Sequence, residues 1–411
     1  MAIVRPGTAE DCRVLRDEDQ AAEHMSGICF KTGPPSRIGV ELEFTTHHDG
    51  APERPLTVAA LREALGTYAP ASLATETPRH PAEPGPPRPL PGGGLVTVEP
   101  GGQLEISSAP AATLADLHAS VNADLARLSG LLSGHGLRLG TSGIDPYREP
   151  RRLLDSPRYT AMERAFDRAG QHGRTMMCST AGLQVCLDAG PAPRLADRFA
   201  AVTELGPVLL ATFANSPRHA GRDTGWASTR MRAWLGIDPA RTRPVGTGAD
   251  PVGAWIGYAM AAPLLCLRRD DGCWDPPPGI TFADWLAGAL PRPPTADDLE
   301  YHLSTLFPPV RPRGYLEVRY LDALPGDEWL APAAVLAALL ADDATTDAAR
   351  AAAAPAADRW LPAARAGLGD RTVRGAARAV LDLAGRALHR AGLPAHLQSR
   401  VHAAIEHRLL T

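Results

Sequence analysis

Two glutamates lie two residues apart in one of the most regular segments of the chain. From Ile38 to Phe44, apolar residues alternate with Gly39, Glu41 and Glu43, which is the period of a β-strand with one buried face. Side chains two apart on a strand share a face, with backbones roughly 6–7 Å apart. Carboxylates that close repel each other unless a cation lies between them or one keeps its proton. The pattern therefore indicates cation binding or proton chemistry.

A second acidic group is predicted on a β-hairpin. The turn Pro100–Gly102 interrupts an alternating pattern over residues 95–107, as expected for two strands joined by a tight connection. The second strand places Gln103 and Glu105 on one face. Glu99 comes directly before the turn and is expected to reach the same space.

Two later runs repeat this design. Gln184 alternates with apolar residues over 183–188, and Glu317 shares a face with Arg319 over 315–320. For any one strand the alternative is a solvated sheet face, but such a face usually also carries Lys, Thr and Ser. Glutamate, glutamine and arginine on four strands indicate a site instead. Several oxygen ligands on a rigid sheet suit Mg²⁺ bound jointly by carboxylates and substrate phosphates.

The elements that must position these residues predict an α+β fold. Four alternating strands favour a curved, mostly antiparallel sheet with helices packed on its apolar face. Leucines at helical spacing predict one long helix over residues 113–133, and a second is expected over 371–391.

The chain is expected to form a single domain in three segments. Residues 1–36 are a lead-in, 37–330 the catalytic core and 331–411 a helical buttress of the same domain. Residues 77–94 are rich in proline and glycine and cannot pack regularly, so a mobile surface loop is predicted there. Such a loop serves as a functional lid or is an inert insertion.

Composition limits the partners. The net charge is −4 and no basic stripe is visible, so neither nucleic acid nor an anionic membrane is expected to bind. Lys31 is the only lysine, and the Gly-rich-Lys-Ser/Thr string of phosphate-loop proteins is missing. Phosphate chemistry must therefore rely on arginine, metal ions and backbone amides.

Cysteine spacing and the apolar runs bear on location. The six cysteines form no C-x-x-C pair and no zinc spacing with histidine. The first residues lack the apolar run of a signal peptide. The longest apolar stretch, residues 333–341, is too short to span a bilayer. A cytoplasmic protein with free thiols is expected, and a monomer, because no strong dimerisation stripe is visible.

Five blocks of the sequence resemble the plant-type glutamate–cysteine ligases, in the order of that family. Within the family, residues 314–325 are most similar to the bacterial form of the ergothioneine pathway. The resemblance covers roughly residues 37–325. The blocks are Gly39–Phe44, Glu99–Ser107, Met176–Val185, Phe213–Thr242 and Leu316–Arg319.

The resemblance implies a glutamine-synthetase-like fold in which the sheet forms an active-site funnel. It also implies that ATP, L-glutamate and L-cysteine react through a γ-glutamyl phosphate, with two or three Mg²⁺ ions. For Glu99, the alternative to binding a metal ion is contact with substrate. The implied metal ligands are Glu41, Glu43, Glu99, Glu105 and Glu317.

The basic and amide side chains complete the predicted site. Arg319, acting with Glu317, is expected to stabilise the transferring phosphoryl group; the alternative is a structural ion pair. Arg230 is assigned to an acidic group of a substrate, or else to a surface ion pair, and Arg241 is balanced between the same two roles. The predicted substrate- or ATP-binding residues are Gln103, Gln184, Arg230, Trp234 and Arg241.

Trp234 has two interpretations, a wall of the substrate pocket or ordinary core packing. The function as a whole also has rivals. One is a γ-glutamyl ligase that uses a different amine, because acceptor specificity depends on pocket shape. Others are a non-catalytic nucleotide- or metal-binding relative and a metal-binding structural protein.

Overall fold

A six-stranded antiparallel sheet organises the chain. The structure is a computed structural model that describes residues 13–74, 87–270 and 272–410. The order of the strands is β3-β4-β1-β6-β10-β9, and all neighbours run antiparallel. The strands are β1 Ile38–Phe44, β3 Leu95–Val98, β4 Leu104–Ser107, β6 Gly182–Leu187, β9 Val310–Pro312 and β10 Leu316–Asp322. The expected mixture of helices and an antiparallel sheet is therefore confirmed.

Two short pairs of strands lie outside this sheet. They are β2 Thr46–His48 with β5 Leu137–Leu139, and β7 Arg218–His219 with β8 Arg222–Asp223.

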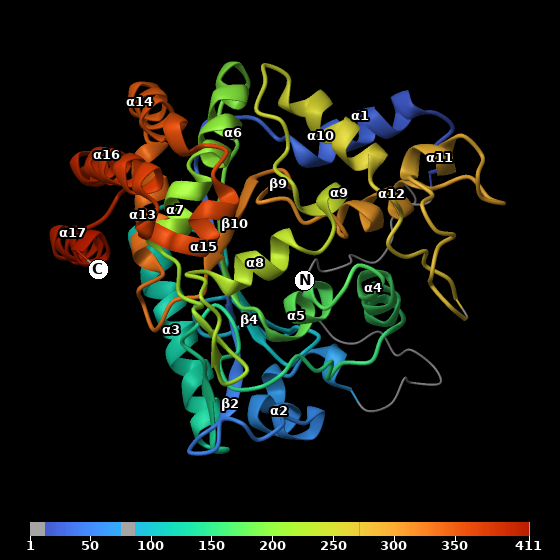
Figure 1. Cartoon of the computed structure of the whole chain (residues 1–411), viewed down its shortest axis with the longest axis horizontal. Helices are drawn as coiled ribbons and strands as arrows, with labels where there is room; N and C mark the ends of the chain where they lie inside the picture. The colour runs from blue at the N-terminus through green and yellow to red at the C-terminus, as the bar shows by residue number, and fades with distance from the viewer. Residues whose placement is uncertain (1–12, 75–86, 271, 411) are drawn as a thin grey trace.

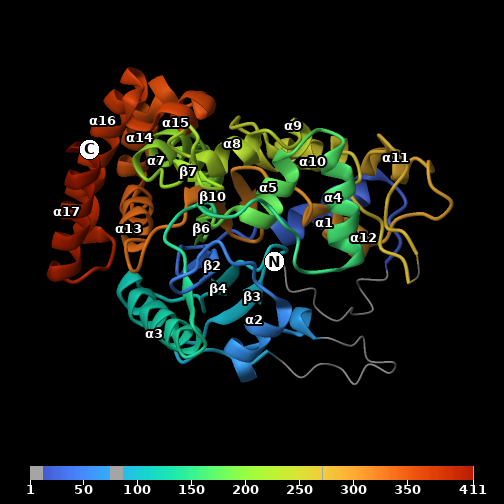
Figure 2. The same ribbon diagram turned by 60° about the horizontal axis from the view of Figure 1, so that its bottom comes forward.

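Helices lie on both sides of the strands. In Figures 1 and 2 the C-terminal helices α13–α17 lie to the left of the strands and α4 and α12 lie to the right. The helices up to the end of β6 are α1 Glu18–Cys29, α2 Val58–Leu65, α3 Leu114–Ser133, α4 Pro157–Asp167 and α5 His172–Ser179. Those before β9 are α6 Leu195–Glu204, α7 Gly206–Thr212, α8 Thr229–Leu235, α9 Pro239–Thr242, α10 Pro251–Ala261, α11 Phe282–Leu286 and α12 Ala296–Leu303. The last are α13 Leu330–Leu339, α14 Asp343–Ala353, α15 Trp360–Ala366, α16 Arg371–Ala387 and α17 Ala395–Leu410.

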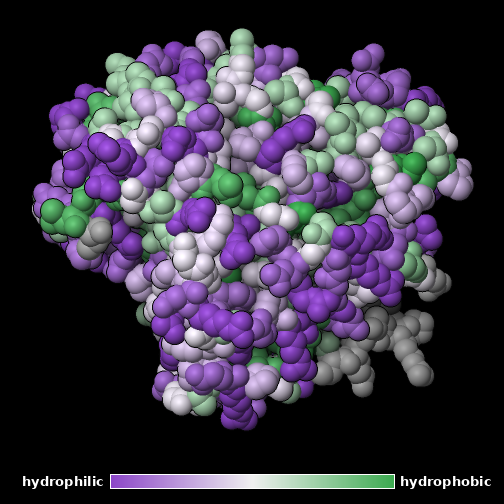
Figure 3. Space-filling view, viewed as in Figure 1, coloured by the Kyte–Doolittle hydropathy of each residue, from purple (hydrophilic) through white to green (hydrophobic). Residues whose placement is uncertain are grey.

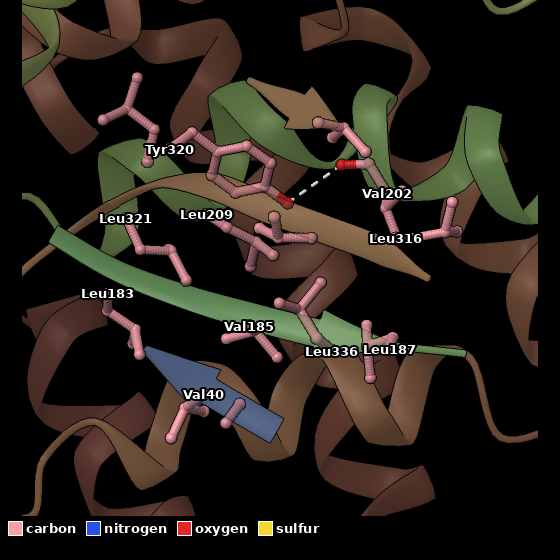
Figure 4. Close-up of a cluster of buried hydrophobic side chains, with 14 of the residues drawn as sticks. Val40, Leu183, Val185, Leu187, Val202, Leu209, Leu316, Tyr320, Leu321 and Leu336 are labelled. Carbon is pink, nitrogen blue, oxygen red and sulfur yellow. Dashed lines mark hydrogen bonds between the residues drawn. The ribbon is translucent and has the colours of Figure 1, made fainter. Parts of the chain in front are cut away.

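The apolar face of the sheet forms the core. Val40, Val185 and Leu316 lie on three neighbouring strands, and Leu209 of α7 and Leu336 of α13 cover them (Figure 4). All five side chains are at most 2% exposed, and each such burial contributes about 1.5–3 kcal/mol. Because side chains alternate along a strand, burying this face turns the glutamates toward the other.

Local sequence explains the best-defined elements. Thr113 caps α3 by accepting a hydrogen bond from the backbone N–H of Asp116, so the predicted helix begins where expected. The hairpin turns at residues 99–102, where Gly102 has a φ of 89°. A Cβ at Gly101 would lie 2.1 Å from the backbone oxygen of Cys178, so only glycine fits there.

The predicted mobile loop over residues 77–94 lies largely outside the described residues. Its last part is described and is tied to α3, because Asp124 accepts hydrogen bonds from the N–H groups of Gly92 and Gly94 at 2.5 and 2.9 Å. In the view of Figure 3, hydrophilic residues predominate and apolar residues lie in separate small groups. Among the described helices, none combines the length and apolarity needed to cross a membrane.

Candidate active site

Neighbouring strands bring the predicted polar residues onto one face of the sheet. Glu43 lies opposite Glu105 of β4, and Glu41 lies between Ser107 on one side and Gln184 on the other. Directly opposite residues of antiparallel strands point the same way. The face predicted from the alternation in each strand is therefore shared by β4, β1 and β6.

Burial and mutual repulsion change the acid strength of Glu41 and Glu43. Burial raises the pKa of Glu41 to about 7, and the charges of Glu105 and Glu317 add to this. Burial likewise raises the pKa of Glu43 to about 7; Arg230 opposes the rise, and Glu99 and Glu105 add to it. A cation bound here would favour the ionised carboxylates and lower both pKa values.

A chain of hydrogen bonds links the acidic residues to the basic ones. Glu43 accepts from the backbone N–H of Gly182 at 2.6 Å and from the Gln184 amide at 3.1 Å. The Gln184 carbonyl oxygen in turn accepts from Arg319 Nη1. Gln184, predicted to orient substrate, therefore joins a carboxylate to an arginine within the protein.

Glu317 lies at the centre of an arginine cluster. Its fully buried carboxylate pairs with Arg311 at 2.7 Å, Arg319 at 2.8 Å and Arg313 at 3.0 Å. Burial alone would raise the pKa of Glu317, but the three arginines hold it well below the usual range. A metal ion at Glu317 would have to displace one of these guanidinium groups. Metal ligation by Glu317 therefore stays a prediction, and the structure gives this residue a second role as an anchor for arginines.

The acidic and basic groups meet in a cavity of about 400 Å³, within the usual range for small-molecule sites. Its sheet side is lined by Glu41, Glu43, Glu99, Pro100, Gln103, Gln184, Arg311 and Arg319. Its other wall is formed by Ser156, Pro157, Arg158, Tyr159, Met162, Met176, Met177, Thr180, Trp234, Arg268, Trp274, Tyr301, Ser304 and Phe307.

The second wall holds functional candidates that sequence reasoning missed. The guanidinium carbons of Arg158 and Arg268 lie 4.9 and 4.7 Å from the centre of the Tyr301 ring, and Arg158 donates to the Ser304 hydroxyl at 3.0 Å. Arg268 is also paired with Asp297, so the positive charge that this ring holds for an anionic group comes mainly from Arg158. In the sequence, a helix cap at Ser156 predicts a helix that begins beside Arg158. Nothing in the spacing of the residues predicts that Arg158 and Arg268 lie close together.

The remaining glutamates differ in position. Glu99 lines the cavity and burial raises its pKa. Glu105 does not line it; its fully buried carboxylate accepts from the Thr97 and Ser107 hydroxyls at 2.7 and 3.0 Å.

Gln103 and Trp234 both line the cavity with their polar atoms bonded to protein. The Gln103 amide donates to the backbone oxygen of Thr180 at 2.9 Å and accepts from the N–H of Gly101 at 2.9 Å, which fixes the hairpin. Trp234 is 5% exposed and donates to the backbone oxygen of Phe307 at 2.8 Å. Both interpretations of Trp234 therefore apply, because its side chain forms part of the cavity wall and also packs in the core.

Arg230 and Arg241 do not line this cavity. The side chain of Arg230 is 1% exposed, so the surface ion pair considered for it is wrong. Arg241 is 2% exposed and pairs with Asp238 at 3.1 Å beside a separate cavity of about 320 Å³. Its guanidinium also donates to the backbone oxygens of Thr305 and Pro263. Arg241 therefore does form an ion pair, but with its own side chain buried instead of lying at the surface, and direct contact with substrate stays a prediction for both arginines.

Whether the site fits Mg²⁺ depends on the carboxylates. Among the described residues, no group of three or more His, Cys, Asp or Glu side chains stands ready as a metal site. Glu41, Glu43 and Glu99 nevertheless line one cavity, and their pKa values are all raised. Mg²⁺ commonly takes one or two carboxylates together with substrate phosphates. The donor set fits an ion bound in that shared way.

Comparison with known proteins agrees with this geometry. Residues 37–408 match the model of glutamate–cysteine ligase family 2 (GCS2). The chain is 38% identical over 390 residues to glutamate–cysteine ligase EgtA of Mycobacterium tuberculosis, a match that covers 92% of this chain and 85% of the relative. The corresponding values for EgtA of Mycolicibacterium smegmatis are 39% over 377 residues, 89% and 84%.

More distant relatives extend the comparison. The chloroplastic glutamate–cysteine ligase of Arabidopsis thaliana is 34% identical over 257 residues, which is 60% of this chain and 49% of the relative. A glutamate–cysteine ligase of Francisella tularensis, solved in complex with AMP, superimposes with a TM-score of 0.54 at 14% identity, covering 92% of this chain and 83% of that one. This structural likeness supports the fold alone. Together with the family match, the curated relatives show that the chain belongs to glutamate–cysteine ligase family 2 and is a ligase of that family.

Proposed function

We propose that this ligase uses ATP and Mg²⁺ to join the γ-carboxylate of L-glutamate to the amine of L-cysteine. The product would be γ-glutamylcysteine, for ergothioneine biosynthesis. The observation that carries the proposal is one cavity in which the carboxylates of β1 lie beside the arginines of β9 and β10. The similarity to EgtA supports cysteine as the acceptor and the ergothioneine pathway as the destination.

The reaction takes two steps. An oxygen of the glutamate γ-carboxylate attacks the γ-phosphorus of ATP, so that a C–O–P linkage forms and ADP leaves. The amine of cysteine then attacks the acyl carbon, phosphate leaves with the C–O bonding electrons, and the nitrogen loses a proton. Both reactants of the first step are anions, so neutralising and aligning charge is the main task of the protein.

Each part of the cavity has a task in this scheme. Glu41, Glu43 and Glu99 would hold two or three Mg²⁺ ions, with Glu105 and Glu317 as the further predicted ligands. When bound, the ions neutralise charge on the phosphate oxygens.

The arginines of the sheet stabilise the transferring phosphoryl group. Arg319 and Arg311 line the cavity, and Glu317 holds both in place by ion pairs. Arg158 on the opposite wall, beside the Arg268–Asp297 pair, provides positive charge for the α-carboxylate of an amino acid substrate, next to the apolar side chains of Met162 and Met176.

The finer features of the fold belong to the same proposal. A glutamine-synthetase-like sheet that forms a funnel fits a cavity built on one face of the strands. Residues 37–330 would form the catalytic core and 331–411 a buttress, since α13 packs on the apolar face opposite the cavity. We expect the protein to act as a monomer in the cytoplasm.

The test is release of ADP by the purified protein with Mg²⁺, ATP and glutamate, with and without cysteine, followed by mass analysis of the product. We expect release that rises with cysteine and yields γ-glutamylcysteine. Arg319→Ala should abolish most turnover, whereas Arg386→Ala should not, because Arg386 lies exposed on α16 and, among the described residues, pairs only with Asp382 of the same helix. Turnover with another amine alone would refute the acceptor. A lack of turnover and of ATP binding would refute the ligase reaction.

A further inference from the structure

Arg158, the arginine that faces the cavity from α4, is held by the end of α12. Its Nη1 donates to the Ser304 hydroxyl at 3.0 Å, and its Nη2 donates to the Ser304 backbone oxygen at 3.1 Å. Its guanidinium carbon also lies 4.9 Å from the centre of the Tyr301 ring. Ser304 comes directly after the last residue of α12. The position of this charge in the cavity wall therefore depends on where the loop after α12 lies.

Arg241 of α9 fixes that loop at two points. Its Nη1 donates to the backbone oxygen and to the hydroxyl of Thr305, at 3.4 and 3.3 Å. Its own backbone oxygen accepts from the N–H of Phe307 at 2.9 Å. Thr305 is the neighbour of Ser304 in the chain, and Phe307 lines the cavity. One residue thus holds the loop on which Arg158 depends.

The other donors of Arg241 are fixed to two further segments. Its Nε pairs with Asp238 at 3.1 Å, and its Nη2 donates to the backbone oxygen of Pro263. The side chain is 2% exposed and does not line the cavity. A guanidinium suits this task because its donors point in fixed, diverging directions, whereas a lysine ammonium is a single point of charge.

We infer that Arg241 is a positioning residue: it holds the loop Ser304–Phe307, and the loop holds Arg158 where that side chain binds the carboxylate of an amino acid substrate. The inference rests on the proposed function, in which Arg158 supplies the charge for this carboxylate. Arg241 acts through its neighbours and contacts no substrate itself.

Arg241→Lys should loosen the loop without removing charge from the cavity. The ammonium can keep its pairing with Asp238, but it cannot reach Thr305 and Pro263 as well. Arg158 stays charged in the cavity wall and loses its fixed position. Hydrogen bonds to charged groups account for factors of about 10–100 in affinity. Because the charge of Arg158 remains, we expect a loss at the lower end, on the order of tenfold.

The experiment is calorimetric titration of L-glutamate and of L-cysteine into the unchanged protein, Arg158→Ala, Arg241→Lys and the double variant. Binding is measured without turnover, so the result is separate from the test of the ligase reaction. We expect Arg158→Ala to weaken binding of one of the two amino acids, and Arg241→Lys to weaken binding of the same one about tenfold. In the Arg158→Ala background, Arg241→Lys should have almost no further effect, because the two residues act as a unit.

Arg198→Lys is the matched control. Arg198 of α6 is also a buried arginine that joins segments, since it is 6% exposed and donates to the backbone oxygens of Asp188, Ala189 and Leu340. It does not line the cavity. Arg198→Lys should lower Tm, as Arg241→Lys does, and should leave the affinity for both amino acids unchanged.

Several results would overturn the inference. Unchanged affinities in Arg241→Lys would show that this arginine supports the fold alone. Losses from Arg158→Ala and Arg241→Lys that multiply would show that the two residues act independently. An equal loss of affinity in Arg198→Lys would assign the effect to general destabilisation.

Failure of the inference can be told apart from failure of the proposed role of Arg158. Arg158→Ala without effect on either amino acid would refute that role, and the inference with it. An effect of Arg158→Ala that Arg241→Lys does not share would refute the inference alone. Should Arg241→Lys fail to fold, Thr305→Val replaces it, because it removes the hydroxyl that accepts from Arg241, and the same outcomes decide.

Discussion

Glu41 and Glu43 should make the stability of the metal-free protein fall as the pH rises through 7. Both carboxyls have pKa values of about 7 in the folded chain, against 4.5 for an ordinary glutamate. Between these values the folded state holds more protons than the unfolded state. Stability therefore decreases with rising pH in this window, because its slope follows the difference in bound protons. Below the window the ionised Glu317 opposes this trend, since its pKa is lowered by the arginines.

The size of the effect follows from these pKa values. One pKa unit corresponds to about 1.4 kcal/mol, so a rise from 4.5 to about 7 gives roughly 3 kcal/mol for one such group. The two carboxyls interact, so we take about 3 kcal/mol for the pair rather than double that amount. A chain of 411 residues has an unfolding entropy of about 0.9 kcal/mol per kelvin. The full fall in Tm from pH 4.5 to about 7 is therefore about 3–4 °C, and the part that lies above pH 5.5 is about 2 °C.

The assay is thermal unfolding from pH 5.5 to 8.5 with a chelator present and again with Mg²⁺. Glu43→Gln should flatten the profile, because the amide resembles the protonated acid at every pH. Glu63→Gln, at an exposed position on α2, should keep the full slope. Mg²⁺ should stabilise the protein more at pH 8 than at pH 6, with affinity changing about tenfold per pH unit for each proton displaced.

Two results would refute this reasoning. A Tm that rises with pH between 5.5 and 8.5 without metal would mean that the carboxylates are already ionised and compensated. Mg²⁺ stabilisation that is equal at pH 6 and pH 8 would mean that the ion binds without displacing protons from them. Either result would show that Glu41 and Glu43 are not a protonated pair of carboxyls held apart from other cations.

Three further predictions concern other parts of the molecule. Glu317→Gln leaves neighbouring arginines without their counter-charge and should lower the free energy of unfolding by about 3–5 kcal/mol, measured by denaturant titration. Arg311→Ala should lower kcat by on the order of 10²-fold, and it should also lower Tm, because the buried Glu317 loses one of its three ion-pair partners; unchanged kinetics would show that this arginine serves Glu317 alone. In a maleimide time course read by peptide mapping, the exposed Cys273 should react at once. Cys29 and Cys178, which are both buried, should react only on unfolding, because burial raises the pKa of both thiols.

Much of the candidate site could be predicted because a strand has a period of two. The alternation over Ile38–Phe44 and over 103–107 determines which side chains share a face whatever the neighbours of each strand are, and the structure places Glu43 opposite Glu105 as that argument requires. The hairpin and the helix capped by Thr113 were equally accessible, since their signals are local.

The residues of the site that could not be predicted depend on contacts between segments that lie far apart in the sequence. Arg158 and Arg268 meet only at the Tyr301 ring, and neither lies in an alternating strand, so no local pattern marks them. The surface interpretation of Arg230 failed for a related reason. Nothing near Arg230 in the sequence reveals that the bulge in β10 leaves a backbone oxygen for it to bind.

The same contacts explain why acidic and basic groups can share one cavity without cancelling each other. The arginines of β9 and β10 are held by Glu317, while Glu43 is held by the Gly182 amide and Gln184. Gln184 is neutral and lies between Glu43 and Arg319, so it links the two charges without allowing a direct ion pair. A carboxylate kept apart from arginine stays available to a cation, and an arginine kept apart from that carboxylate stays available to a phosphoryl group. Replacing this glutamine by glutamate would add a carboxylate against Arg319 and so compete with the anionic substrate for the same charge.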